Sequence, residues 1–392
     1  MKSKKNILFI SIANDMYGSS KVLLSLVLQM QKHSKDYHPI VCLPPGDGPL
    51  KEILKESGIH ILEMPVVKLT RSMLKSLNFI CLFRDYFKAK RILKRELKGI
   101  EISCVQSNTL ATMFGAMYCV FHKPKHIVHV HEIMDRPKVA RLFFKTILQL
   151  FSGHIVYNSI ATQQFYDGMS PRIKRKSTLI LNGVDRGEVA TSEEKIRSIR
   201  KELFAASEDQ FLIGLVGRIN RLKGHQLSLE AFQSMADKYP KAKLCFVGST
   251  PPNQEFYLTN LQDEVQRMGI EDKVSFVDFQ DNVYAVLESL DLVLVPSTEP
   301  ESFGLIVVEA MLSKKAVIGS DIGGISTIIE HGETGLLFPP NDKEALAEAI
   351  TTLMENNDQK QLLESNAFKK AEAVYSTNAM YQKFNQLYNS EL

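Results

Sequence analysis

Two carboxylates stand eight residues apart, Glu301 and Glu309, on either side of the turn Ser302-Phe303-Gly304. This segment follows a short apolar run, so a strand ends there and we expect a helix to open near the turn. Free N–H groups at a helix start, beside a glycine that permits close approach, form an anion site. Carboxylates accept hydrogen bonds from hydroxyls, which riboses and sugars offer in pairs. An anion site between two such carboxylates predicts a nucleotide-sugar ligand.

Two cations follow an earlier strand, at a second glycine-rich turn. Gly217 and Arg218 end the apolar run Phe211–Val216, and Lys223-Gly224 precedes a helical pattern. A fork-shaped guanidinium and an ammonium together suit a diphosphate, and they could stabilise charge on a leaving nucleotide. The alternative is that both are solvated loop cations.

Two other glycine turns also follow strands. Gly323-Gly324 comes after the run 316–319, where it either lets a ligand approach the backbone or only makes a tight turn. Gly18-Ser19-Ser20 comes after the first strand, and we expect Ser19 to cap the helix that begins there.

A cluster of histidines surrounds another strand end. His126, His129 and His131 lie on one predicted strand, with His122 just before it. Alternation along a strand places His129 and His131 on one face and His126 on the other. Since no carboxylate pattern completes a zinc site, we expect no metal centre. His131 is then either a core histidine or a donor to a ligand hydroxyl.

The elements that position these residues form an α/β pattern. Continuous apolar strands alternate with helical stretches, which indicates parallel sheets covered on both faces. Two such series predict two doubly wound, Rossmann-like domains, at residues 1–185 and 186–370. Residues 371–392 are expected to form a helix that packs back across both. Sheets of this kind bind ligands at the carboxyl ends of their strands, where all the residues above lie.

Composition places the chain among globular proteins. It has 392 residues, of which 44% are hydrophobic and 23% charged, and no apolar run is long enough to cross a bilayer. Five scattered cysteines without a CxxC pair fit a reducing compartment. With no signal-peptide pattern at its start, we expect a cytoplasmic protein.

Charge is distributed unevenly. Residues 1–186 contain 29 Lys and Arg against 13 Asp and Glu, whereas the remainder contains 19 against 31. Lys68–Lys98 alone has ten basic residues interleaved with apolar ones. Such a segment can lie on an anionic membrane, here the inner face of the plasma membrane, or simply be a solvated helix with its apolar side in the core. Nucleic acid is disfavoured because no recognition motif accompanies the charge.

The segment from Glu301 to Glu309 resembles the E-x7-E motif of family-4 retaining glycosyltransferases (glycosyltransferase group 1), which have the GT-B fold, two domains facing across a cleft. The resemblance extends over nearly the whole chain and is strongest from Gly214 to Asn341. It departs at Gly18-Ser19-Ser20, where the family has a Gly-Gly pair. The residues that it assigns to catalysis are Glu301, His131, Arg218 and Lys223, and those that it assigns to donor binding are Glu309, Ser302, Phe303, Gly304, Gly18, Gly217, Gly323 and Gly324.

The resemblance implies a metal-independent retaining hexosyltransferase without a cofactor, in which the nucleotide sugar (UDP or GDP) is a substrate. Its acceptor would be a glycan or a lipid-linked sugar in cell-surface polysaccharide synthesis. The sequence contains no GxGxxG after a strand, no GxxxxGK[ST] and no DxD pair, which disfavours dinucleotide, P-loop and metal-dependent chemistry. Two alternatives stay open: a nucleotide-sugar epimerase of the same fold, and a non-catalytic partner subunit of a glycosyltransferase.

Overall fold

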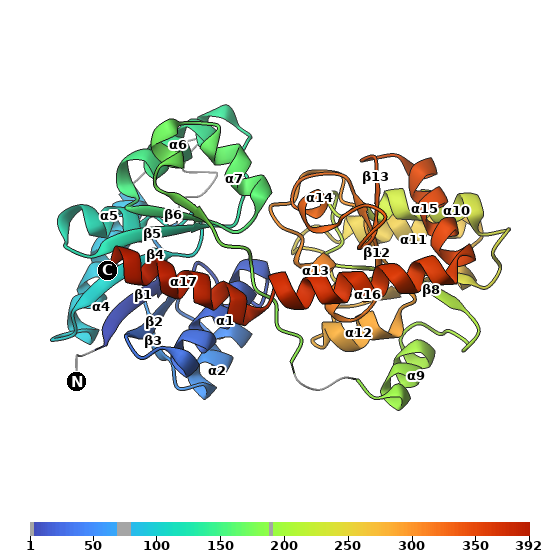
Figure 1. Cartoon of the computed structure of the whole chain (residues 1–392), viewed down its shortest axis with the longest axis horizontal. Helices are drawn as coiled ribbons and strands as arrows, with labels where there is room; N and C mark the ends of the chain where they lie inside the picture. The colour runs from blue at the N-terminus through green and yellow to red at the C-terminus, as the bar shows by residue number, and fades with distance from the viewer. Residues whose placement is uncertain (1–3, 69–79, 188–190) are drawn as a thin grey trace. The chain divides into compact units, whose positions relative to one another are not determined.

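The computed structural model describes residues 4–68, 80–187 and 191–392 (Figure 1). Contacts divide the chain into two units, Met1–Val184 with Ser376–Leu392 and Asp185–Tyr375. The sequence-based boundary at residue 185 lies one residue beyond this division. Across the described ranges, no helix is both long and apolar enough to span a membrane.

The described residues contain thirteen strands, in the two series that the alternation of apolar runs and helical stretches predicts. In the first unit seven parallel strands form one sheet in the order β3-β2-β1-β4-β5-β6-β7. The strands are β1 (Lys5–Ile10), β2 (Tyr37–Leu43), β3 (His60–Glu63), β4 (Ile102–Ser107), β5 (Lys125–Val130), β6 (His154–Tyr157) and β7 (Ser177–Leu179).

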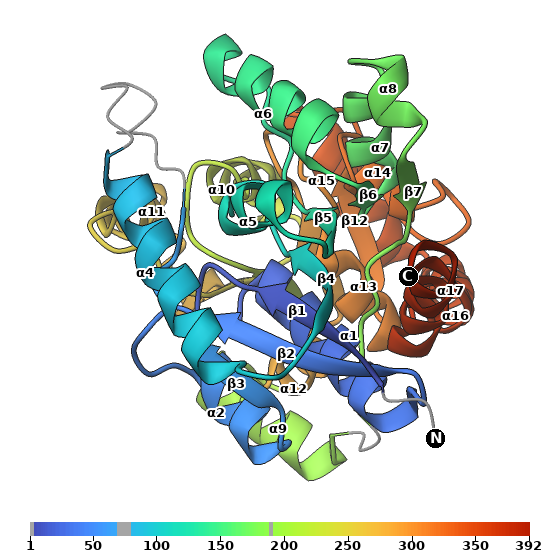
Figure 2. The ribbon, with the colours of Figure 1, turned by 90° about the vertical axis from the view of Figure 1, so that its left-hand side faces the viewer.

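Helices cover both faces of this sheet (Figure 2). On one face, α4, α5 and α6 pack side chains such as Tyr86, Phe114 and Phe144 into a core with Leu8 and Val105. On the other, α1 packs against α17. The helices are α1 (Gly18–His33), α2 (Pro49–Glu56), α4 (Ile80–Glu96), α5 (Phe114–Phe121), α6 (Lys138–Phe151), α7 (Ile160–Asp167), α8 (Pro171–Lys174) and α17 (Thr377–Glu391).

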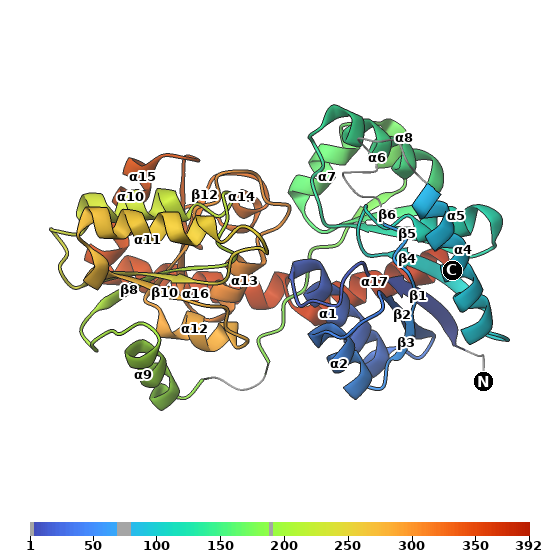
Figure 3. The ribbon, with the colours of Figure 1, turned by 180° about the vertical axis from the view of Figure 1, so that it is seen from behind.

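The second unit repeats the design with six parallel strands in the order β10-β9-β8-β11-β12-β13 (Figure 3). They are β8 (Phe211–Val216), β9 (Ala242–Val247), β10 (Val274–Val277), β11 (Leu292–Val295), β12 (Ala316–Ser320) and β13 (Leu336–Phe338). The helices are α9 (Glu193–Glu202), α10 (His225–Met235), α11 (Phe256–Met268), the 3₁₀ turn η1 (Glu271–Lys273), α12 (Val283–Ser289), α13 (Leu305–Leu312), α14 (Ile325–Ile328), α15 (Lys343–Glu355) and α16 (Asn357–Val374).

Residues 371–392, which were expected to form one helix, contain the end of α16 and all of α17. Helix α16 ends in the second unit, and α17 starts after Ser376 and belongs to the first. The Ser376 hydroxyl accepts a hydrogen bond from Ala379 N, which caps the new helix. Ser376 also forms an isolated parallel β-bridge with Val184. A serine cap therefore interrupts the helix where the chain returns to the first unit.

Candidate active site

Lys223 and Glu301 lie together at the carboxyl ends of β8 and β11. The Lys223 ammonium donates to Glu301 Oε1 at 2.7 Å, and the buried Ser297 hydroxyl donates to the same oxygen. Only 27% and 19% of the lysine and glutamate side chains are exposed. The structure thus joins two predicted site residues that are 78 positions apart. Sequence reasoning missed Ser297, although it lies only four residues before Glu301 in the motif.

The surroundings of Glu301 keep its carboxylate ionised. Burial acts to raise the pKa of this group, but the Lys223 charge and the hydrogen bonds from Lys223 and Ser297 outweigh it. The pKa of Glu301 therefore lies below its ordinary value. At neutral pH the side chain is a fixed anion that can accept hydrogen bonds from hydroxyls.

Backbone contacts hold the two strand-end loops together. Thr298 N donates to Leu222 O at 2.9 Å. Gly224, in the left-handed region at φ 75°, lies so close to Pro296 that a Cβ would be 1.9 Å from the Pro296 carbonyl oxygen. As predicted, a helix (α10) begins directly after Gly224. Gly217 and the half-buried Arg218 precede this loop at the end of β8.

Helix α13 opens at the turn, as predicted. Gly304 is its N-cap at φ 101°, so Ser302 and Phe303 lie in the loop, and the seven residues between Glu301 and Glu309 are not one continuous helix. The Phe303 ring is buried against Tyr375, at 5.8 Å between ring centroids. Glu309 is buried within α13. The pKa of Tyr284 is raised mainly because that tyrosine is buried, and the negative charge of Glu309 raises it further.

Gly323 and Gly324 pack against the loop that carries Glu301. Gly324 N donates to Glu301 O at 2.7 Å, and a Cβ on Gly324 would lie 2.3 Å from Phe303 O. A Cβ on Gly323 would lie 2.6 Å from Glu301 O. The close approach that these glycines permit is therefore to the motif's own backbone, which positions Glu301.

In the first unit, His131 follows β5 and is buried beside His129, with 4.0 Å between ring centroids. Its Nε2 has no hydrogen-bond partner among the described residues. Burial lowers the pKa of His131 to about 3, so the imidazole is neutral and can donate to or accept from a hydroxyl. Next to it, burial raises the pKa of Glu132 to about 7.

The histidines are arranged as the strand alternation predicted. His129 contacts Phe384 of α17, whereas His126 Nε2 bonds the Ser107 hydroxyl and its Nδ1 bonds Phe151 O, towards α6. His122 instead stacks on Tyr118. His126 and His129 thus contact different elements, on opposite faces of the sheet.

Helix α1 begins at Gly18, but Ser19 does not cap it. The N-cap is Tyr17, which makes no side-chain capping bond, and Asp15 Oδ1 instead accepts from Tyr17 N and from the Ser20 hydroxyl. A carboxylate upstream thus orders the turn. Asn108, after β4, donates to Ser19 O at 2.9 Å and ties the turn to the sheet edge.

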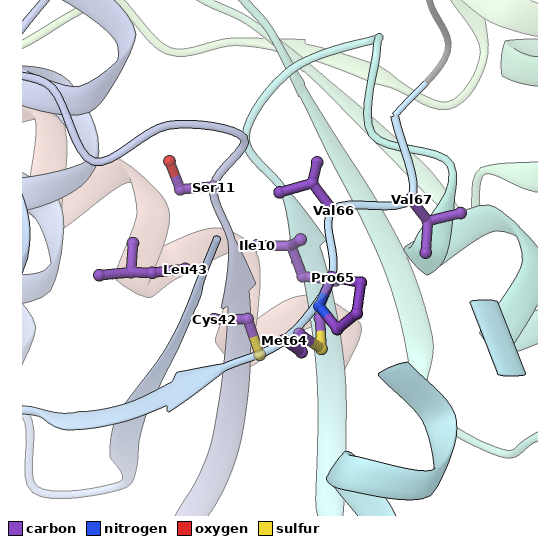
Figure 4. Close-up of a pocket in the computed structure, with 8 residues that line it drawn as sticks. All are labelled: Ile10, Ser11, Cys42, Leu43, Met64, Pro65, Val66 and Val67. Carbon is purple, nitrogen blue, oxygen red and sulfur yellow. The ribbon is translucent and has the colours of Figure 1, made fainter. Parts of the chain in front are cut away.

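Two pockets lie near strand ends. One of about 180 Å³ is lined mainly by apolar residues from the ends of β1 and β2 and the segment after β3, and none of the predicted site residues lines it (Figure 4). The other, of about 570 Å³, borders the β8–α10 loop, and its lining includes Gly224, Arg221, Tyr257 and Thr298.

Comparison with known structures supports the fold. HepE of Anabaena, solved in complex with UDP and glucose, superposes with a TM-score of 0.82 at 23% identity, covering 98% of this chain and 99% of HepE. The two share the GT-B fold, which confirms the predicted fold class.

The sequence matches are confined to part of the chain. The family model of glycosyl transferases group 1 matches residues 196–370, which lie within the second unit. N-acetyl-alpha-D-glucosaminyl L-malate synthase of Bacillus anthracis is 34% identical over 176 residues, 45% of this chain and 43% of the relative. D-inositol 3-phosphate glycosyltransferase of Corynebacterium glutamicum is 29% identical over 186 residues, which are 46% of this chain and 44% of that relative. The chain thus matches less than half the length of these two relatives.

Proposed function

We propose that this chain is a retaining glycosyltransferase that transfers a hexose or N-acetylhexosamine from a UDP- or GDP-sugar to a glycan or lipid-linked acceptor in cell-surface polysaccharide synthesis. The observation that carries the proposal is the Lys223–Glu301 pair, within the residues that the group 1 family model matches. A cation for the diphosphate and a fixed carboxylate for sugar hydroxyls lie 2.7 Å apart. The UDP and glucose named with HepE favour UDP as the nucleotide.

The proposed roles follow from the chemistry of each group. Arg218 and Lys223 would bind the diphosphate and stabilise its charge as it leaves, which makes a metal unnecessary. Glu301 would accept hydrogen bonds from the donor sugar, Glu309 from the ribose, and the backbone at Ser302–Gly304 would contact phosphate. His131, whose Nε2 has no partner among the described residues, would donate to or accept from a sugar hydroxyl. Retention of configuration rests on the family resemblance.

Nucleotide release from a panel of UDP-, GDP- and ADP-sugars tests this proposal. The purified chain is assayed with and without EDTA and with and without a lipid extract as acceptor, beside Glu301→Ala. Release from one donor that persists in EDTA and is lost in the variant is the expected result. Interconversion of the sugar without release would instead establish an epimerase. A folded protein that neither binds nor turns over any donor would be a non-catalytic subunit.

The Ser297→Ala variant should shift the pH profile of this activity. Loss of one hydrogen bond to the charged form raises the pKa of Glu301, so the carboxylate protonates at a higher pH. The acidic limb of the kcat/KM profile should therefore move to higher pH. Ser289→Ala is the matched control, since Ser289 is buried in the same unit and donates only to Ala285 O. An unchanged acidic limb in a folded Ser297→Ala protein would remove Ser297 from the site.

Peripheral association with an anionic membrane completes the proposal. Of the basic segment Lys68–Lys98, residues 69–79 lie outside the described residues. From residue 80 the segment forms α4, whose Leu82, Tyr86 and Leu93 are buried in the core while its basic residues are largely exposed.

A further inference from the structure

Exposed apolar side chains are concentrated on one side of the first unit. Of the sixteen large hydrophobic residues that are exposed in the described part of the chain, ten fall between residues 80 and 151. This segment includes α4, α5 and α6, and α5 packs against both of its neighbours (Figure 2). All of these apolar groups except Ile100 therefore lie on three helices that pack side by side.

Helix α6 carries an apolar stripe on each of its two sides. Ala140, Phe144 and Leu148 are buried in the core. Val139, Leu142 and Leu150 are 63%, 64% and 55% exposed. At 100° per residue the exposed three lie within about 80° of one another, on the side away from the core. Exposed apolar groups that gather on one side of a helix mark a surface that another molecule covers.

Helix α4 presents a matching outer face. Phe83 and Phe87 are more than half exposed, and Arg91 and Lys94 follow on the same side of the helix. Val120 and Phe121, at the end of α5, are also exposed. Each of the three neighbouring helices thus exposes aromatic or aliphatic groups, and we term their outer sides together the α4–α6 face.

The charge around this face identifies the partner. Helix α6 contains Lys138, Arg141 and Lys145 and no acidic residue, and α4 contains six basic residues against two acidic ones. A second copy of the chain would bring these cations together at a cost. Nucleic acid would satisfy the cations but leave the aliphatic stripe uncovered. An anionic bilayer satisfies both, since its phosphates pair with the cations and its acyl region takes up the apolar groups.

We propose that the α4–α6 face is the membrane-contact surface and that α6 inserts its Val139, Leu142 and Leu150 stripe in the plane of an anionic bilayer. This inference rests on the proposed membrane association and adds to it a second helix, outside Lys68–Lys98, as the inserting element. With 14 residues, α6 is too short to span a bilayer and lies along it. Lysine and arginine stems beside the stripe can reach phosphates while the apolar groups lie deeper.

Because the chain contains no tryptophan, a single introduced tryptophan reports its own surroundings. Leu142→Trp is compared with Leu362→Trp, whose site is similarly exposed but on α16 of the second unit. With phosphatidylglycerol–phosphatidylcholine vesicles, the emission of Leu142→Trp should shift to the blue and that of Leu362→Trp should not. A blue shift at neither position, or at both equally, would overturn the proposal.

Vesicle flotation of the full chain tests the surface without an added tryptophan. Leu142→Ser/Leu150→Ser should weaken binding to anionic vesicles roughly tenfold, and Phe83→Ser/Phe87→Ser should weaken it to a similar extent. Leu362→Ser should bind as the unchanged chain does, and neutral vesicles should bind at least about tenfold more weakly. Undiminished binding of the α6 variant would exclude α6, and an α6-dependent dimer in sedimentation without lipid would make the face a contact between copies.

Donor binding separates this inference from the proposed function. UDP binding by calorimetry, without lipid, should be the same in all these variants, because their substitutions lie outside the candidate active site. If the unchanged chain floats with vesicles but binds no nucleotide, the proposed function fails and the membrane surface stands. If it binds UDP and stays in the soluble fraction, the surface fails alone.

Discussion

The Glu301→Gln variant should keep its fold and lose roughly 100- to 1000-fold in kcat/KM for sugar transfer, about 3–4 kcal/mol of transition-state stabilisation. The amide has nearly the same shape but carries no charge, and one of its two polar atoms donates instead of accepting. It can still accept the Lys223 and Ser297 hydrogen bonds that now meet at Glu301 Oε1. The loss of activity should therefore come from weaker contacts between this side chain and the donor sugar. Steady-state kinetics with the donor identified in the panel measures that loss.

Glu299→Gln is the matched control for this prediction. Glu299 lies two residues away, is about half exposed and pairs with Arg221. Surface ion pairs of this kind contribute up to about 1 kcal/mol, so its kcat/KM should stay within about threefold of the unchanged chain. Equal activity of Glu301→Gln and Glu299→Gln would show that Glu301 makes no contact that matters in the transition state.

Gly224→Ala should have the largest effect on stability, lowering the free energy of unfolding of the second unit by about 3–5 kcal/mol. The new Cβ would lie 1.9 Å from Pro296 O, which is backbone and cannot rotate aside. The positive φ of 75° adds about 1–2 kcal/mol of strain. Relief of the overlap would separate the β8–α10 and β11–α13 loops and with them Lys223 and Glu301, so UDP binding should be lost together with stability.

Gly269→Ala isolates the part of this effect that comes from overlap. Gly269 has a similar φ of 66°, but a Cβ there meets nothing within 4 Å. Urea unfolding followed by circular dichroism, with calorimetry of UDP binding, should show a loss of only about 1–2 kcal/mol and normal binding for this control. If the two variants are equally stable, the contact between Gly224 and Pro296 does not hold the loops together.

The strands and the fold class were predictable because the signal is local. A parallel strand covered on both faces must be apolar throughout, as in Leu292–Val295, and its neighbours along the chain do not alter that requirement. The positions of helix ends were harder to predict from the sequence. Ser19 lies at a typical capping position, yet the helix begins one residue before it, and Asp15 orders the turn by accepting from Tyr17 N and the Ser20 hydroxyl.

The sequence by itself determined the two parallel sheets and the residue types at their carboxyl ends, since both follow from apolar periodicity and from motifs whose residues are close in the chain. Only the tertiary structure decided that Lys223 and Ser297 share one oxygen of Glu301, that Gly323 and Gly324 pack against the Glu301 loop, and that α6 exposes a second apolar stripe. Contacts between residues many positions apart depend on how strands are ordered and how loops meet, and no local pattern encodes them. Burial likewise belongs to the packed molecule, because a leucine on a helix looks the same in sequence whether its face is covered or open to solvent.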